Sequence, residues 1–151
     1  MPIYAGQDLG PGNLNTLAAR ASRSTTQSAA SGALTAVNFN IEDYDNANMF
    51  APTSTNMTLP VAGLWAFAGY AAVATNATGY RRLLIEVGVT GTYVTIDQRP
   101  AVAGDNTHMS IAGTYLANAG DQLRLIVQQN SGAALNITAG ASLSAWLIIS
   151  S

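Results

Sequence analysis

The sequence predicts an all-β protein: an antiparallel jelly-roll sandwich preceded by a short helical arm. From Leu34 onward, apolar and polar residues alternate in short runs, which is typical of strands that are buried on one face. Gly, Asn and Asp residues separate these runs at short intervals. Long segments of helical period do not interrupt them. Many short strands without intervening helices favour a sandwich or jelly roll of about eight strands.

Residues 1–33 differ in kind from the rest, and the sequence predicts that they form an N-terminal arm in front of a domain spanning residues 34–151. After the turn-forming Gly-Pro-Gly of residues 10–12, Asn13 can cap a short helix. Its apolar side chains fall at helical spacing: Leu14, Leu17, Ala18 and Ala21. Residues 22–33 are small and polar, as in a linker.

The predicted helix is too short to be stable alone in water, so we expect the arm to become ordered by docking on another protein. The residues expected to anchor it are Tyr4, Leu9, Leu14 and Leu17.

The predicted strands follow one another to the end of the chain. Residues 37–41, 82–87 and 122–128 alternate cleanly and are expected to be half-buried. Further strands are expected at residues 64–73, 92–98, 108–116, 134–139 and 142–150.

Two of these strands are apolar on both faces, which a single sandwich does not explain. In residues 64–73 and 142–150, large apolar or aromatic side chains occupy both odd and even positions. A sandwich strand turns only one face to its own core, and soluble proteins rarely expose large apolar patches. Contact with another subunit is the favoured cover, and a loop or the arm is the alternative. The candidate interface residues are Trp65, Tyr70, Trp146 and Ile148.

The composition fits a subunit of an assembly and argues against several other classes. Charged residues are 9% of the chain, against about 25% in typical globular domains. A net charge of −2 offers no electrostatic footprint for nucleic acid or for an anionic membrane. The chain has no cysteine, and its first residues lack the pattern of a signal peptide, so we expect a protein made in the cytoplasm.

From about Leu34 to Ile149, the sequence resembles the globular head of complement component 1q and its tumour-necrosis-factor-like relatives. The motif pattern begins with Tyr44-Asp45, Phe50 and Pro52 and continues with residues 60–65, PVAGLW. Near the end, YLANAGDQLRL (residues 115–125) and the closing aromatic strand ASLSAWLIIS (residues 141–150) complete it. The sequence departs from the family pattern at Met49 and Ala145, where glycine is usual, and it has no collagen-like stalk. The resemblance implies a jelly roll of about ten strands that assembles as a homotrimer, with the strands around Leu64–Val73 and Trp146 near the three-fold axis.

The opening residues, MPIYAGQDLGPGNLNTLAARAS, resemble the start of bacteriophage structural proteins. All six basic residues are Arg, as in phages of GC-rich bacteria. Together these features predict a virion protein: a homotrimeric capsid decoration or minor tail protein, made in the host bacterial cytoplasm. The arm would attach it to major capsid or tail proteins of the particle.

The alternative is a receptor- or carbohydrate-binding tip of a phage tail fibre that contacts a host-surface glycan. That function needs exposed aromatic side chains on distal loops, and the candidates outside the core strands are Tyr80, Tyr93 and Tyr115.

Catalytic, cofactor and metal motifs are not found, so the chain is not expected to be an enzyme. His108 is the single histidine and lies in a predicted strand without a Ser–His–Asp pattern around it. Glu42, Asp43 and Asp45 could supply oxygen ligands to calcium, but their spacing lacks the glycine and terminal glutamate of a calcium loop. A solvated turn is the favoured interpretation of these acids.

Overall fold

The computed structural model describes residues 16–151, which form a two-layered β-sandwich. The larger layer has seven strands, in the order β2-β11-β6-β12-β1-β4, with β9 on the other edge of β6. The smaller layer has five strands, in the order β3-β10-β7-β8, with β5 beside β10. Every named strand pairing is antiparallel, and the described residues contain no helix. The predicted jelly-roll sandwich is therefore confirmed.

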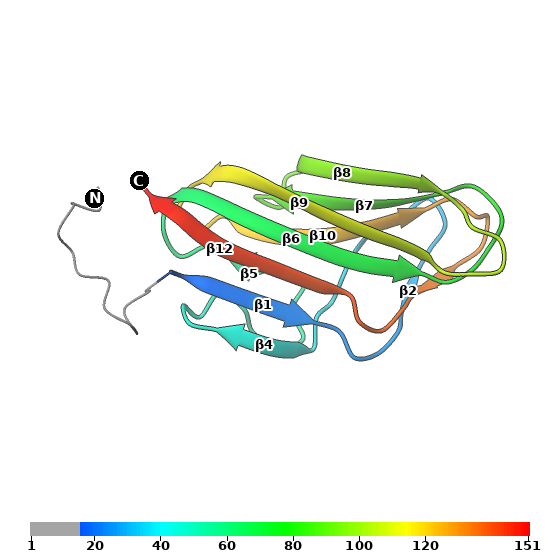
Figure 1. The fold of residues 1–151 in the computed structure, drawn as a ribbon, viewed down its shortest axis with the longest axis horizontal. Helices are drawn as coiled ribbons and strands as arrows, with labels where there is room; N and C mark the ends of the chain where they lie inside the picture. Colours follow the sequence, from blue (N-terminus) through cyan, green and yellow to red (C-terminus); the bar gives the residue numbers. More distant parts are fainter. Residues whose placement is uncertain (1–15) are drawn as a thin grey trace.

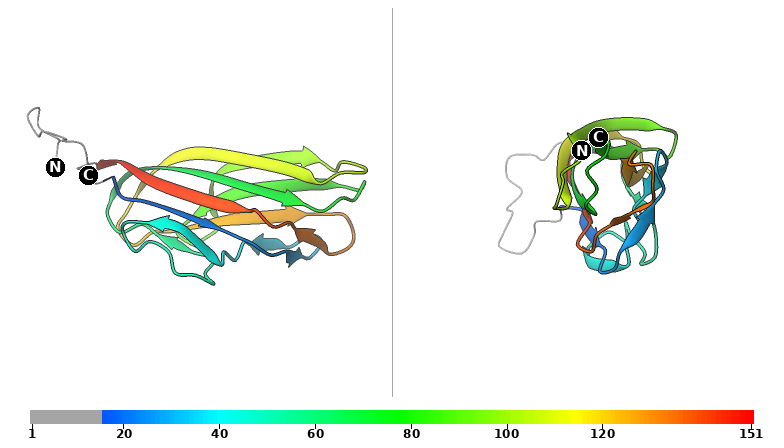
Figure 2. Two further views of the ribbon diagram at one scale, coloured as in Figure 1. Left: turned by 60° about the horizontal axis from the view of Figure 1, so that its bottom comes forward. Right: turned by 90° about the vertical axis from the view of Figure 1, so that its right-hand side faces the viewer.

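The seven-stranded sheet comprises β1 (Ala18–Ser22), β2 (Gln27–Ala29), β4 (Ile41–Asp45), β6 (Gly63–Val73), β9 (Thr107–Ala117), β11 (Leu135–Ile137) and β12 (Ser142–Ser150). The five-stranded sheet comprises β3 (Leu34–Ala36), β5 (Met57–Thr58), β7 (Tyr80–Val87), β8 (Thr92–Pro100) and β10 (Gln122–Gln129). Figure 1 shows the long strands running along the molecule, with the start of β1 and the end of β12 at the same end. The right-hand view of Figure 2 looks along the strands and shows the two layers facing each other.

The core is filled by the inward-facing residues of both sheets. On β6, Trp65, Phe67 and Val73 point inward, and on β10, Leu123 and Leu125 do. Because side chains alternate along a strand, these positions fix which face of each sheet is left outside. The sheets approach closely at Gly69, where an added Cβ would lie 2.5 Å from Leu125 Cδ1.

The helix predicted after Asn13 is wrong for its described part. Ala18–Ser22 is strand β1, which pairs with β12 on one side and with β4 on the other. Ala19 and Ala21 are fully buried between the layers, while Arg20 points outward. Pairing on both sides satisfies the backbone hydrogen bonds that a helix would have made internally, so tertiary contacts override the local spacing.

The linker predicted over residues 22–33 contains a strand. Gln27–Ala29 is strand β2, paired with β11. The side chain of Gln27 donates to the carbonyl oxygen of Ala36 at 2.8 Å and accepts from the amide of Asn38 at 2.9 Å. The sandwich therefore includes strands that precede the predicted boundary at Leu34, and the separate anchoring role of residues 1–33 stays a prediction.

Candidate functional site

The outward side of the seven-stranded sheet carries an uncharged surface across β12, β6 and β9. Because Trp65 and Phe67 face the core, the alternate β6 residues face outward. Their cross-strand neighbours on β9 and β12 share that orientation. We call this surface the uncharged face, and its outward positions are Leu64, Ala66, Ala68, Tyr70 and Ala72 on β6, His108, Ser110, Ala112, Thr114 and Leu116 on β9, and Ser142, Ser144, Trp146 and Ile149 on β12. None of these residues is an Asp, Glu, Lys or Arg. Ala66 and Ala72 are covered by the larger side chains around them and are themselves buried.

Large apolar side chains gather at one end of the uncharged face. Leu64 lies opposite Leu116 on β9 and opposite Ile149 on β12, so the three are cross-strand neighbours. Trp146 follows one row further along. Leu116 is 69% exposed, Ile149 62% and Trp146 39%. We call these residues, with the adjacent half-exposed Ile148, the end patch; an apolar group of this size left in water is characteristic of a contact surface.

Toward the other end, the uncharged face carries a polar pair beside a shallow depression. The hydroxyl of Tyr70 lies 2.7 Å from Nδ1 of His108, and the two rings are stacked at 6.2 Å between centroids. Small residues floor the depression, whose lining includes Ala68, Tyr70, Ser110, Ser142 and Ser144, with Arg20 of β1 at its border. The small side chains let another flat surface approach this part of the sheet closely.

Three of the four predicted interface residues lie where a second subunit could reach them. Tyr70, Trp146 and Ile148 are outside the core. Trp65 was wrongly assigned: it is completely buried within its own chain, and its indole N–H donates to the carbonyl oxygen of Val61 at 3.1 Å. The register of β6 turns Trp65 inward and Tyr70 outward, so the two cannot share one face.

The residues predicted to anchor the arm divide between described and undescribed parts of the chain. Tyr4, Leu9 and Leu14 lie outside the described residues. Leu17 packs against the core, and its carbonyl oxygen accepts a hydrogen bond from the amide of Leu147 at 2.9 Å. Leu17 is thus committed to its own domain, because β1 begins beside it, and it is not an exposed anchor.

The three tyrosines considered for glycan binding do not form a common platform. Tyr80 lies beneath the guanidinium of Arg82, 4.6 Å from its ring centroid. Tyr93 sits opposite Glu86, near the far end of β7 from Tyr80. Tyr115 packs against the core. The three rings therefore lie apart, and glycan binding stays a prediction.

Two of the three acidic residues considered as calcium ligands, Asp43 and Asp45, make contacts within the fold. Both carboxylate oxygens of Asp45 accept backbone hydrogen bonds within its turn, from Ala47 at 3.0 Å and from Phe50 at 2.8 Å. Asp43 pairs with Arg20 at 3.3 Å and accepts from the Ser22 hydroxyl. Nowhere in residues 16–151 do three or more His, Cys, Asp or Glu side chains come together as metal ligands would.

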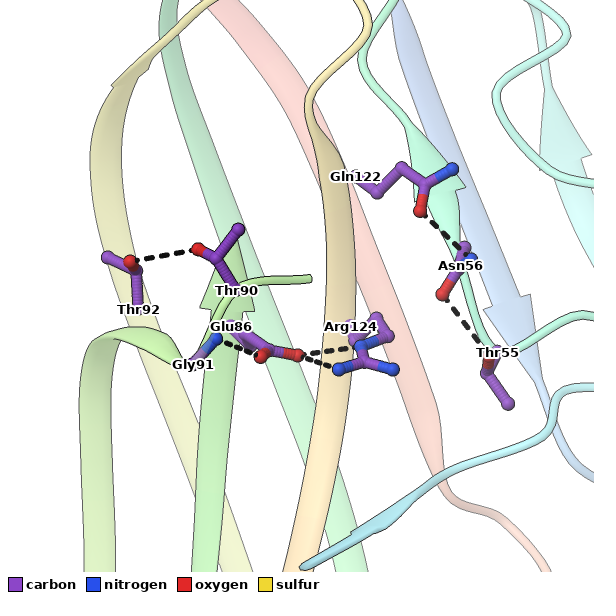
Figure 3. Close-up of polar contacts among 8 residues, drawn as sticks. All are labelled: Thr55, Asn56, Glu86, Thr90, Gly91, Thr92, Gln122 and Arg124. Carbon is purple, nitrogen blue, oxygen red and sulfur yellow. Dashed lines mark hydrogen bonds and ion pairs between the residues drawn. The ribbon is translucent and has the colours of Figure 1, made fainter. Parts of the chain in front are cut away.

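A polar network at the outer face of the five-stranded sheet was missed by sequence reasoning. Glu86 on β7 is buried and lies opposite Arg124 on β10, and its carboxylate also accepts the amide N–H of Gly91 in the following hairpin (Figure 3). Nearby, Asn56 donates to Gln122 at 3.1 Å. The sequence did show opposite charges, Glu86 and Arg124, at outward positions of two alternating strands. The pairing of β7 with β10, which places them opposite each other, is visible only in the structure.

None of the described segments is a helix of the length and hydropathy needed to cross a bilayer.

Comparison with known proteins supports the fold and gives one viral relative. No protein-family model matches the chain. A protein of Acanthamoeba polyphaga mimivirus, itself uncharacterized, is 33% identical over 86 residues, which cover 54% of this chain and 36% of the mimivirus protein. The chain therefore spans about a third of that protein's length.

Solved structures of similar fold cover most of the chain at low identity. The globular domain of zebrafish complement 1qA aligns with a TM-score of 0.68 and 17% identity, covering 89% of this chain and 99% of that domain. The Eiger tumour necrosis factor of S. frugiperda aligns at 0.67 and 8% identity, covering 90% and 94%. Murine APRIL aligns at 0.67 and 12% identity, covering 89% and 100%. The chain thus has the jelly-roll fold seen in complement 1q globular domains and tumour-necrosis-factor-like proteins.

Proposed function

We propose that the chain is a structural protein of a virus particle that assembles as a homotrimer through its uncharged face. The observation that carries this proposal is the end patch, where Leu116, Ile149 and Trp146 are exposed side by side on the long strands of the larger sheet. Burying a large apolar side chain contributes about 1.5–3 kcal/mol. Three copies of the patch, meeting around one axis, supply that gain several times over.

The remainder of the uncharged face suits close packing of identical subunits. Ala66, Ala68 and Ala112 add little bulk, and none of the uncharged face residues brings a formal charge that would repel its own copy. The resemblance to complement 1q heads and tumour-necrosis-factor-like proteins favours three copies around a closed axis over an open chain.

A place on a virus particle is supported by two independent features. The mimivirus relative is a viral protein. The opening residues resemble those of phage structural proteins. This resemblance supports the narrower proposal that the chain is a bacteriophage capsid decoration or minor tail protein, localised to the virion. In that setting, residues before Thr16 attach the trimer to capsid or tail proteins, and three weak contacts reinforce one another through avidity.

Charge substitution at the end patch tests the assembly. Leu116→Glu places three carboxylates at the proposed axis, and we expect light scattering to report a monomer where the unchanged protein gives a trimer. Ile96→Glu is the matched control, because Ile96 is 55% exposed on the other sheet; it should stay trimeric. Wild-type protein that is monomeric at micromolar concentration would refute the proposal.

Attachment is tested separately, with a truncation that the fold can tolerate. Since β1 begins at Ala18, a deletion must stop short of Thr16 to leave the sheet intact. Removal of residues 2–15 should yield a folded protein that no longer co-purifies with particles. Unchanged incorporation would refute the anchoring role.

A further inference from the structure

His108 is the one residue of the uncharged face that can gain a charge between about pH 5 and pH 8, where histidine ordinarily takes up a proton. Its side chain is exposed on β9, and the hydroxyl of Tyr70 lies 2.7 Å from its Nδ1. The sequence contains no second histidine. A change in the charge of this face near neutral pH therefore depends on His108.

Protonation reverses the hydrogen bond between His108 and Tyr70. A neutral imidazole can accept the Tyr70 hydroxyl proton at Nδ1, whereas a protonated one can only donate from both nitrogens. The Tyr70 hydroxyl must then accept, and its own proton needs another acceptor. Because the two rings are stacked at 6.2 Å between centroids, both changes occur at the same part of the face.

The surroundings of His108 provide no negative charge to balance an added proton. No carboxylate in residues 16–151 lies within ion-pair distance of its ring. On β6, which pairs with β9, the facing residues are Tyr70 and Ala72. The charged groups on the adjoining elements have partners of their own: Asp105, before β9, accepts from the Asn106 amide, Asp97 and Arg99 on β8 pair with each other, and Arg20 on β1 pairs with Asp43.

We propose that protonation of His108 dissociates the trimer in mild acid. This inference rests on the proposed function, in which the uncharged face is buried between subunits. Assembly in acid would take three charged rings out of water, and the face has no carboxylate to offset that cost. Three-fold symmetry brings the same charge from every copy into one interface. A neutral His108 is compatible with that burial, and a protonated one opposes it.

Proton uptake and assembly therefore compete, and the competition sets the size of the effect. Each His108 that must lose a proton on assembly lowers the association constant about tenfold per pH unit, so three copies lower it by up to about a thousandfold per unit. Sedimentation and light scattering between pH 8 and pH 5 should show the trimer giving way to monomers. Circular dichroism should stay unchanged, because the monomers remain folded.

Two substitutions at His108 separate its charge from its packing. His108→Gln keeps a polar side chain that does not titrate, so the association constant should lose its pH dependence, whatever its value at pH 8. His108→Arg carries its charge throughout this range and should be monomeric even at pH 8. Ile96→Arg is the matched control, because Ile96 is 55% exposed on the other sheet; it should keep both the trimer and its pH dependence.

The Hε1 proton NMR resonance of the single histidine measures its protonation directly. In concentrated trimer, this resonance should reach its protonated position at a lower pH than in the monomeric Leu116→Glu variant. Identical titrations, an association constant that does not fall between pH 8 and pH 5, or a pH dependence that survives in His108→Gln would each overturn the switch and leave the proposed trimer standing. Unchanged protein that is monomeric at pH 8 would overturn the trimer and the switch together.

Discussion

The carboxylate of Glu86 lies directly opposite Arg124 on the neighbouring strand, and its Oε2 accepts the Arg124 Nε–H at 2.6 Å. Its other oxygen accepts the backbone N–H of Gly91 at 2.7 Å. One buried side chain therefore ties β7 to β10 and also holds the hairpin that leads into β8 (Figure 3). Each oxygen has a partner, which offsets the cost of burying the charge.

Breaking this pair should destabilise the fold strongly. Arg124→Met leaves the Glu86 carboxylate buried without its cation, and the free energy of unfolding should fall by about 3–5 kcal/mol. Urea denaturation followed by circular dichroism measures the change. Arg99→Met is the matched control at the exposed Arg99–Asp97 pair, where a loss of about 0–1 kcal/mol is expected. Equal losses in the two variants would contradict a special role for Glu86.

The two tryptophans should respond oppositely to truncation. Trp65→Ala removes a fully buried side chain and should lower the free energy of unfolding by about 3–5 kcal/mol. Trp146→Ala removes a half-exposed one, so it should weaken trimer association while changing monomer stability much less. Concentration-dependent light scattering and denaturant unfolding separate these effects.

Fluorescence provides an independent check on the same pair. With Trp146 replaced by Phe, the remaining emission comes from buried Trp65 and should resist quenching by acrylamide. With Trp65 replaced by Phe, quenching of Trp146 should be efficient in the monomeric Leu116→Glu background and reduced in the trimer. Efficient quenching of Trp146 in both states would place it outside the interface.

The fold class was predictable because period-two alternation is a local property of the sequence, visible in strands such as β7 and β10. The orientation of β6 was not predictable in the same way. Trp65 and Tyr70 are both aromatic and lie on opposite faces, so hydrophobicity alone could not say which one faces the core. Only the register with β9 and β12 decides it.

Strand β1 illustrates the limit of local patterns more sharply. Its sequence, AARAS, has little intrinsic β-propensity, and the neighbouring leucines fit a helical spacing. The strand exists because β12 and β4 pair with it on both sides, although β12 lies more than a hundred residues away in sequence. Likewise, the end patch depends on bringing Leu116, Leu64 and Ile149 together from three strands.

The two sheets approach closely at Gly69, so substitutions at Gly69 and Leu125 should affect stability non-additively. A Cβ at this position would lie 2.5 Å from Leu125 Cδ1 and 3.2 Å from Ile111 Cγ2. Gly69→Ala should therefore cost about 1–3 kcal/mol through overpacking. Combined with Leu125→Ala, which opens space at the contact, the double variant should lose less than the sum of the single losses, by about 0.5–3 kcal/mol. Additive losses in denaturant unfolding would show that the contact relaxes without strain.

Arg81 is a buried cation without a carboxylate partner in the described part of the chain, and it holds a loop in place. Its guanidinium is fully buried, and none of the ion pairs among residues 16–151 involves it. Nη1 donates to the carbonyl oxygens of Thr78 and Tyr80 at 3.0 and 2.9 Å, and Nη2 donates to that of Asn76 at 2.9 Å. The side chain thereby fastens the loop between β6 and β7. Desolvation lowers the pKa of Arg81.

Replacing Arg81 should loosen that loop, because its guanidinium donates to three loop carbonyl oxygens. An ammonium cannot reach three carbonyls with the geometry of a guanidinium, so Arg81→Lys should cost about 2–4 kcal/mol. Because desolvation lowers the pKa of Arg81, burying the protonated guanidinium works against folding, and this cost declines only as pH rises through the pKa of the folded state. Hydrogen exchange should quicken at residues 74–79, whereas the outward-facing control Arg82→Lys should leave that loop protected; equal exchange in the two variants would mean that the carbonyl contacts of Arg81 do not hold the loop.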